Sequence, residues 1–204
     1  MTAALLGFAS GALITAVAFE LFEDAFEHGG EWQAALAFMA GATVFIVVDT
    51  LLDRRTRRRH AAGGSIGLAL LAGVTLDGVP ENLAMGVALV ESGGATLLVA
   101  IFASNLPEAI VGAEKMREAG FGRWRILATW SATAVLLAVA VVVGYAALED
   151  VDHATLAWPL GFAAGAVLAS LADTLMPEAF KEGGPSVAYF TALGFLLSFL
   201  VSAA

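Results

Sequence analysis

The chain contains no cysteine and carries little charge. Only 14% of its 204 residues are Asp, Glu, Lys or Arg, whereas 59% are hydrophobic. The absence of cysteine excludes disulfide bonds, thiolate metal sites and thiol catalysis. The hydrophobic share exceeds the roughly 45–50% of soluble domains, and a soluble helical bundle of this composition would have too little polar surface to cover it. The composition therefore indicates a membrane protein.

The hydrophobic residues form long blocks separated by short polar breaks. A helix needs about 20 mostly apolar residues to cross a bilayer, and lipid offers no partner to unpaired backbone groups, so these blocks are expected to be helices. The sequence predicts an all-α membrane protein with one domain and seven transmembrane helices. The predicted spans within domain 1–204 are roughly 2–25, 32–52, 64–90, 94–116, 124–147, 155–178 and 185–203.

Basic residues occur in only three of the breaks between predicted spans. Alternate breaks of a multi-pass protein share one side of the membrane, and the other three contain no Lys or Arg. The positive-inside rule then predicts that Met1 and the basic loops are cytoplasmic and that Ala204 lies outside, in a plasma membrane. A nucleic-acid patch is the weaker interpretation of the Arg-rich run, so we expect no nucleic-acid partner. The ten basic residues are Arg54, Arg55, Arg57, Arg58, Arg59, Lys115, Arg117, Arg123, Arg125 and Lys181.

Part of the sequence is repeated. Residues 7–30 align without gaps on 161–184, with eleven of twenty-four positions identical. The first and sixth predicted spans cross the membrane in opposite directions, which is the pattern of the inverted repeats of secondary transporters. Chance similarity between Ala-, Gly- and Leu-rich segments is the alternative, and the matched Gly-Phe-Ala and Gly-Gly positions argue against it. The fifth span has no partner in this scheme, so we expect either a seven-span variant or a further helix before Met1.

Two Pro-Glu pairs lie in the middle of otherwise apolar spans. In the third span Asp77 precedes Glu81 by four residues, and in the fourth Ser104 precedes Glu108 by the same spacing, with Asn105 beside it. Four residues are about 6 Å along a helix and share one face. A carboxylate at this depth costs about 2.5–3.5 kcal/mol unless it is compensated.

The prolines add backbone oxygens to these side chains. Pro80 cannot donate to the carbonyl of Leu76, nor can Pro107 donate to that of Ala103. Two facing helices would then offer carboxylates, an amide, a hydroxyl and free carbonyls, a set that suits a divalent cation. The alternative is that each pair marks a kink with a hydrogen-bonded carboxyl group, which two matched motifs make less attractive. The predicted metal ligands are Asp77, Glu81, Ser104, Asn105 and Glu108.

The two motifs resemble those of the ZIP (Zrt/Irt-like) metal-ion transporters. Their sequences here are Asp77-Gly78-Val79-Pro80-Glu81-Asn82 and Ser104-Asn105-Leu106-Pro107-Glu108-Ala109. The resemblance implies eight spans arranged as three plus two plus three, of which the first would be absent here. It also implies a two-metal centre on the two motif-bearing spans, alternating access, and a homodimer formed through the repeated spans.

The chain departs from the family's pattern at the proposed ligands. Asp77 stands where the family usually has a metal-binding histidine, and Gly78 where it often has asparagine; Ser104 and Asn105 replace the common His/Gln and Asn/Asp pair. The next span offers no ionisable side chain except Tyr145, so the number of bound ions stays open. An all-oxygen site shifts the expected ion from zinc towards Mn²⁺ or Fe²⁺, and zinc remains an option because carboxylates also bind it.

The sequence thus predicts a carrier of a divalent metal ion that acts in membrane lipid and needs no prosthetic group. Proton-coupled transport of another solute through the same carboxylates is the main alternative. An enzyme is not expected, because no Ser/His pair or HExxH motif is present. The three histidines, His28, His60 and His153, are expected in solvated loops. Further acidic residues that could serve an ion pathway are Glu20, Asp49, Asp173 and Glu178.

Overall fold

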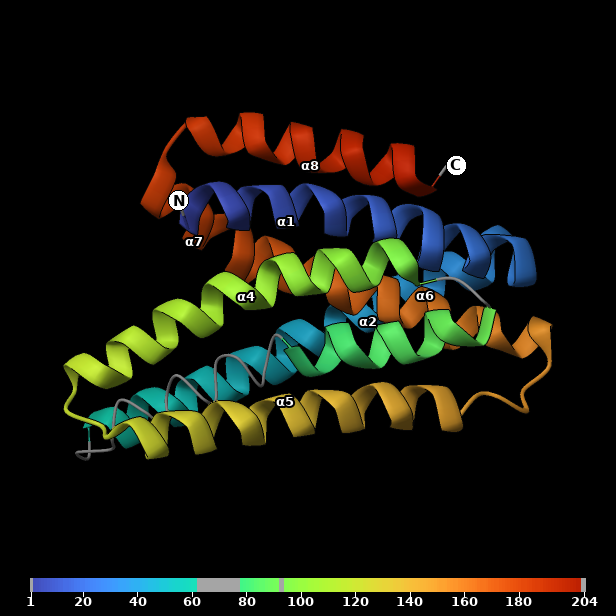
Figure 1. Cartoon of the computed structure of the whole chain (residues 1–204). Coiled ribbons are helices and arrows are strands. Elements are labelled where there is room, and N and C mark those ends of the chain that lie inside the picture. The colour runs from blue at the N-terminus through green and yellow to red at the C-terminus, as the bar shows by residue number, and fades with distance from the viewer. Residues whose placement is uncertain (1, 62–77, 92–93, 203–204) are drawn as a thin grey trace.

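A computed structural model describes residues 2–61, 78–91 and 94–202, and within these ranges the chain is helical and contains no strand (Figure 1). The all-α prediction is therefore confirmed for the described residues. The elements are α1 (Thr2–Ala16), π-helix η1 (Val17–Phe22), α2 (Glu23–Ala61), a helix over 78–88, 3₁₀-helix η2 (Leu89–Glu91), α4 (Ala95–Glu118), α5 (Arg123–Ala146), α6 (His153–Ser170), π-helix η3 (Leu171–Leu175), α7 (Met176–Gly183) and α8 (Ser186–Ser202).

Four helices in the described part of the chain are long and apolar enough to cross a membrane, and α8 is a shorter apolar helix. The first of the four, Thr2–Leu51, contains two predicted spans, which are separated by a kink at Gly30, where φ is 72° and ψ is 175°. The chain reverses its direction there (Figure 1). The third predicted span, 64–90, is described only from residue 78. The total of seven spans therefore stays a prediction.

The basic run after the second predicted span is helical. We expected residues 54–59 to form a loop, but α2 continues through them to Ala61. Arginine is a good helix former, so the helix has no reason to end where its hydrophobic residues do. That expected loop was wrong, as was the one assigned to His60.

The two repeated segments share unusual backbone geometry. The π-helical segments Val17–Phe22 and Leu171–Leu175 occupy equivalent positions of the gap-free alignment. Gly30 and Gly184, also equivalent, both have positive φ, at 72° and 56°, a conformation that residues with a Cβ rarely adopt. A matched sequence pattern is thus accompanied by matched irregularities, and α1 and α6 run in opposite directions (Figure 1).

Helices α1 and α8 touch through their backbones. A Cβ added to Gly11 would overlap the carbonyl oxygen of Thr191, and one added to Gly194 would overlap that of Phe8. Such close approach is possible only for residues without a side chain, which is how small residues join helices in lipid.

The same arrangement joins α2 to α6. A Cβ on Gly165 would overlap the carbonyl oxygen of Phe38, and one on Gly41 would overlap that of Phe162. Gly165 and Phe162 are the repeat equivalents of Gly11 and Phe8. One glycine-to-carbonyl packing pattern therefore builds both helix pairs.

Helices α1 and α6 contribute most to the buried core. Their leucines Leu6, Leu13, Leu156 and Leu160 are at most 2% exposed. In contrast, α5 and α8 expose many large apolar side chains, among them Val142 at 65%. Exposed apolar faces of this kind suit contact with lipid.

We predict that Gly11→Ala and Gly165→Ala each destabilise the protein by about 1–3 kcal/mol, the usual penalty for overpacking. The added methyl group would have to push a neighbouring backbone away, which no rotamer change can relieve. The measurement is the midpoint of thermal unfolding in detergent.

Gly122→Ala is the matched control, because nothing lies within 4 Å of a Cβ at that position and its φ is −69°. Equal unfolding midpoints for all three variants would contradict the backbone-contact explanation.

Candidate ion site on the Pro-Glu helices

The first Pro-Glu motif lies on the helix over 78–88. Glu81 is only 4% exposed, and it is the one ionisable side chain among the buried residues that the structure describes. Asn82 is also buried and donates a hydrogen bond from its side-chain nitrogen to the carbonyl oxygen of Gly78 at 2.8 Å. Asp77, the predicted partner of Glu81, lies outside the described residues.

The second motif lies in the middle of α4, which passes through Pro107 without ending. Ser104 is buried, and its hydroxyl donates to the carbonyl oxygen of Ile101 at 2.9 Å, which leaves its oxygen lone pairs available as acceptors. Asn105 and Glu108 are half-buried. Since Pro107 has no N–H, it cannot donate to the carbonyl of Ala103, as predicted from the sequence.

Helix α5 packs behind the first motif. A Cβ on Gly86 would overlap the carbonyl oxygen of Val141, and one on Gly144 would come within 2.5 Å of that of Leu83. A Cβ on Gly78 would lie 2.8 Å from the side chain of Leu137. The helix over 78–88 and α5 are therefore in close backbone contact. Helix α5, which has no equivalent in the repeat, is thus fixed by packing against the first motif.

Helix α5 also contacts α4, where the ring of Trp130 fills the space above Gly112. The Nε1–H of Trp130 is buried and has no hydrogen-bond partner among the described residues. Gly112 follows Glu108 by four residues, one helical turn. Trp130 therefore packs between α4 and α5.

The structure describes only part of the predicted ligand set. Among residues 2–61, 78–91 and 94–202, no three His, Asp or Glu side chains lie close enough together to hold a metal ion. The set of five ligands includes Asp77, so the complete site remains a prediction.

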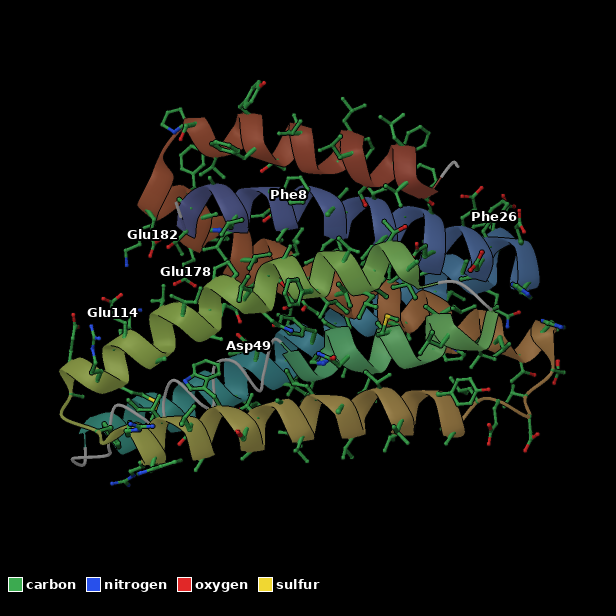
Figure 2. The ribbon with its side chains drawn as sticks, in the orientation of Figure 1. Phe8, Phe26, Asp49, Glu114, Glu178 and Glu182 are labelled. Atoms are coloured by element: carbon green, nitrogen blue, oxygen red, sulfur yellow. The ribbon has the colours of Figure 1, made fainter. Side chains whose placement is uncertain are left out.

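Asp49, a predicted pathway residue, lines a cavity of about 260 Å³ between α2, α6 and the helix over 78–88 (Figure 2). Pro80 and Leu83 form one wall, and Phe45 and Phe162 contribute to the others. Asp49 is the one ionisable residue in this lining, which it shares with the proline of the first motif.

The other predicted pathway residues have different surroundings. Asp173 lies in π-helix η3 and Glu178 in α7, and both are exposed. Glu20 is half-buried, and its two carboxylate oxygens accept hydrogen bonds from the backbone N–H groups of Thr96 and Leu97. Sequence reasoning did not foresee this contact, and the only hint was that α4 begins without a capping side chain.

A second cavity, of about 330 Å³, lies where α1 continues into α2 beside the end of α8. Glu23, Asp24 and Glu27 line it together with the rings of Phe19 and Phe199. Acidic groups that lie close together raise the local concentration of cations. This cavity brings three of them together.

Two histidines meet close to this cavity. The rings of His28 and His153 are stacked, with centroids 5.3 Å apart, and His28 Nδ1 is hydrogen-bonded to the carbonyl oxygen of Asp24. Both residues are helical, so the loop assignment was wrong. Just before His153, Asp152 caps α6; hydrogen bonds from the side chain and the backbone N–H of Thr155 lower the pKa of its carboxyl group.

Four of the described helices have the length and composition of membrane spans, which indicates a helical membrane protein. No family model matches it. It is similar to an Arabidopsis thaliana protein named "Putative zinc transporter", with 28% identity over 189 residues that cover 88% of this chain and 30% of the relative. This chain thus spans about 30% of the relative's length.

We predict that Glu81→Gln abolishes stabilisation by metal, because it removes a charged oxygen ligand from a buried position. Mn²⁺ or Zn²⁺ should raise the unfolding temperature of the native protein, since a ligand stabilises the folded state that binds it. The same ions should leave the unfolding temperature of Glu81→Gln unchanged. The measurement is thermal unfolding in detergent, with chelator and with each ion.

Glu114→Gln is the control, because Glu114 lies on the exposed surface of α4 beside Arg117 (Figure 2). It should respond to metal as the native protein does. An equal metal-induced shift in Glu81→Gln would exclude Glu81 as a ligand.

Proposed function

We propose that this protein transports a divalent metal cation across a plasma membrane through a carboxylate-rich site within the bilayer. The observation that carries the proposal is Glu81, an ionisable side chain that is 4% exposed in a helix of an apolar chain. A membrane protein retains such a group only where something compensates its charge. The relative's name, which describes a zinc transporter, supports the same class of function.

The proposed ligands divide into two kinds. Asp77, Glu81 and Glu108 would supply negative charge, so that the ion and its ligands together carry far less charge than the bare ion does. Ser104 and Asn105 would add neutral oxygens without further charge. Oxygen ligands of this kind favour Mn²⁺ and Fe²⁺ and also accept Zn²⁺.

The proposed transport cycle moves the motif-bearing helices and α5 against the repeated helices. The close glycine contacts support this division, because they join α1 to α8, α2 to α6, and the helix over 78–88 to α5. In this proposal the seven spans form an inverted repeat of the ZIP type, and the repeated spans also form a homodimer. The protein acts without a prosthetic group and catalyses no covalent chemistry.

The deciding experiment is metal uptake into proteoliposomes. Native protein should take up Mn²⁺, Fe²⁺ or Zn²⁺, and Glu81→Ala and Glu108→Ala should each reduce the rate at least tenfold, since each removes a charged ligand. Glu114→Gln should retain native uptake. Unchanged uptake in both alanine variants would refute the metal site. A solute flux that needs a pH gradient and no metal would establish proton-coupled transport instead.

The proposed topology has its own test, which the lack of native cysteine makes simple. A cysteine at exposed Ala147, next to the acidic loop before α6, should react with a membrane-impermeant maleimide added to intact cells. A cysteine at exposed Ala119, in the basic loop after α4, should react only after the cells are opened. The reverse labelling pattern would overturn the proposed orientation.

A further inference from the structure

Helix α4 begins without a cap of its own. Its N-cap residue is Gly94, with φ at 95°, which has no side chain to cap the helix, and the first turn contains no acidic residue. The first N–H groups of a helix have no partner within it, and at Thr96 and Leu97 they are buried, so water has little access to them. A partner must therefore come from elsewhere in the protein.

Glu20 supplies that partner from the neighbouring helix, which contains α1 and η1. One of its carboxylate oxygens accepts from the N–H of Thr96 at 3.1 Å, and the other accepts from the N–H of Leu97 at 3.0 Å. Thr96 and Leu97 are 4% and 0% exposed, so water has little access to this contact. A carboxylate at a helix N-terminus is favourable by both hydrogen bonding and the helix dipole.

The repeat shows that this carboxylate is not part of the shared helix framework. Glu20 lies in π-helix η1, and the equivalent residue in η3 is Thr174. The hydroxyl of Thr174 donates to the carbonyl of Ser170 within its own helix. The same backbone irregularity thus exists without a carboxylate, and what distinguishes Glu20 is its contact with α4.

We propose that Glu20 is a positioning residue for the ion site, a role that rests on the proposed transport function. Leu97 and Glu108 lie on one helix about 16 Å apart, so a shift of the first turn also displaces the ligands. By holding the N–H groups of Thr96 and Leu97, Glu20 sets the position of Ser104, Asn105 and Glu108 relative to α1 in the one state of the proposed transport cycle that the structure describes. Glu20 itself makes no contact with the ion.

The first measurement follows the position of α4 directly. Spin labels on cysteines at Glu114 of α4 and Tyr189 of α8, both exposed, report the distance between these helices in the full-length protein in detergent. Glu20→Gln keeps the shape of the side chain but has only one acceptor oxygen and no charge. The distance distribution should broaden or shift in Glu20→Gln and stay native in Glu118→Gln, which removes an exposed carboxyl group at the other end of α4.

The second measurement separates positioning from simple helix capping. Glu20→Gln should raise the Mn²⁺ concentration for half-maximal uptake about fivefold, the factor that corresponds to loss of one capping interaction. Ala95→Glu, at the exposed first residue of α4, adds a negative charge to the helix end without linking it to α1. In the double variant Glu20→Gln/Ala95→Glu we expect the thermal stability to return to that of the native protein. We expect the distance distribution and the Mn²⁺ dependence of uptake to stay as they are in Glu20→Gln.

Two results would overturn the proposal. Recovery of all three properties in the double variant would mean that Glu20 only caps a helix. A native distance distribution in Glu20→Gln together with weakened uptake would mean that Glu20 acts on the ion directly. If native protein shows no uptake at all, the transport proposal fails, whereas the spin-label result still decides whether Glu20 positions α4.

Discussion

The fold depends on helix backbones that touch. At Gly11, Gly41, Gly165 and Gly194 a carbonyl oxygen of the neighbouring helix occupies the space where a side chain would begin. Lipid tails are as apolar as leucine, so helices in a membrane gain little from burying apolar surface and depend on close packing instead. Each of these contacts fixes how far two helices lie apart, and the buried leucines of α1 and α6 then fill a space whose width is already set.

On this packed framework, three acidic side chains lie between helices. Glu20 reaches the first turn of α4, and Asp49 lines a cavity beside Pro80. Glu81 is buried on the helix over 78–88. In a medium that cannot solvate them, such groups hold specific neighbours strongly. The acidic residues therefore influence both where the helices stand and what could bind between them.

Much of the architecture was predictable from the sequence, because lipid leaves few options. Apolar blocks have to be helices, and the structure adds that the π-helices and the positive φ at Gly30 and Gly184 fall at equivalent positions of the repeat of 7–30 at 161–184. The burial of Glu81 and Ser104 also agrees with the motif spacing. Contacts between distant segments were not predictable: no local pattern shows that Glu20 meets Thr96, that His28 stacks on His153, or that Trp130 packs on Gly112.

The π-helices make the length of the chain as important as its chemistry. A π-helical turn holds more residues than an α-helical one, and each residue of a regular helix turns the chain by about 100°. Deleting one residue within Val17–Phe22 would let that turn relax to an α-helix. The residues on one side of it would then rotate relative to those on the other, and Glu20 and Gly11 could no longer face their partners together. A single missing residue there would do more harm than most substitutions, although it would remove no functional group.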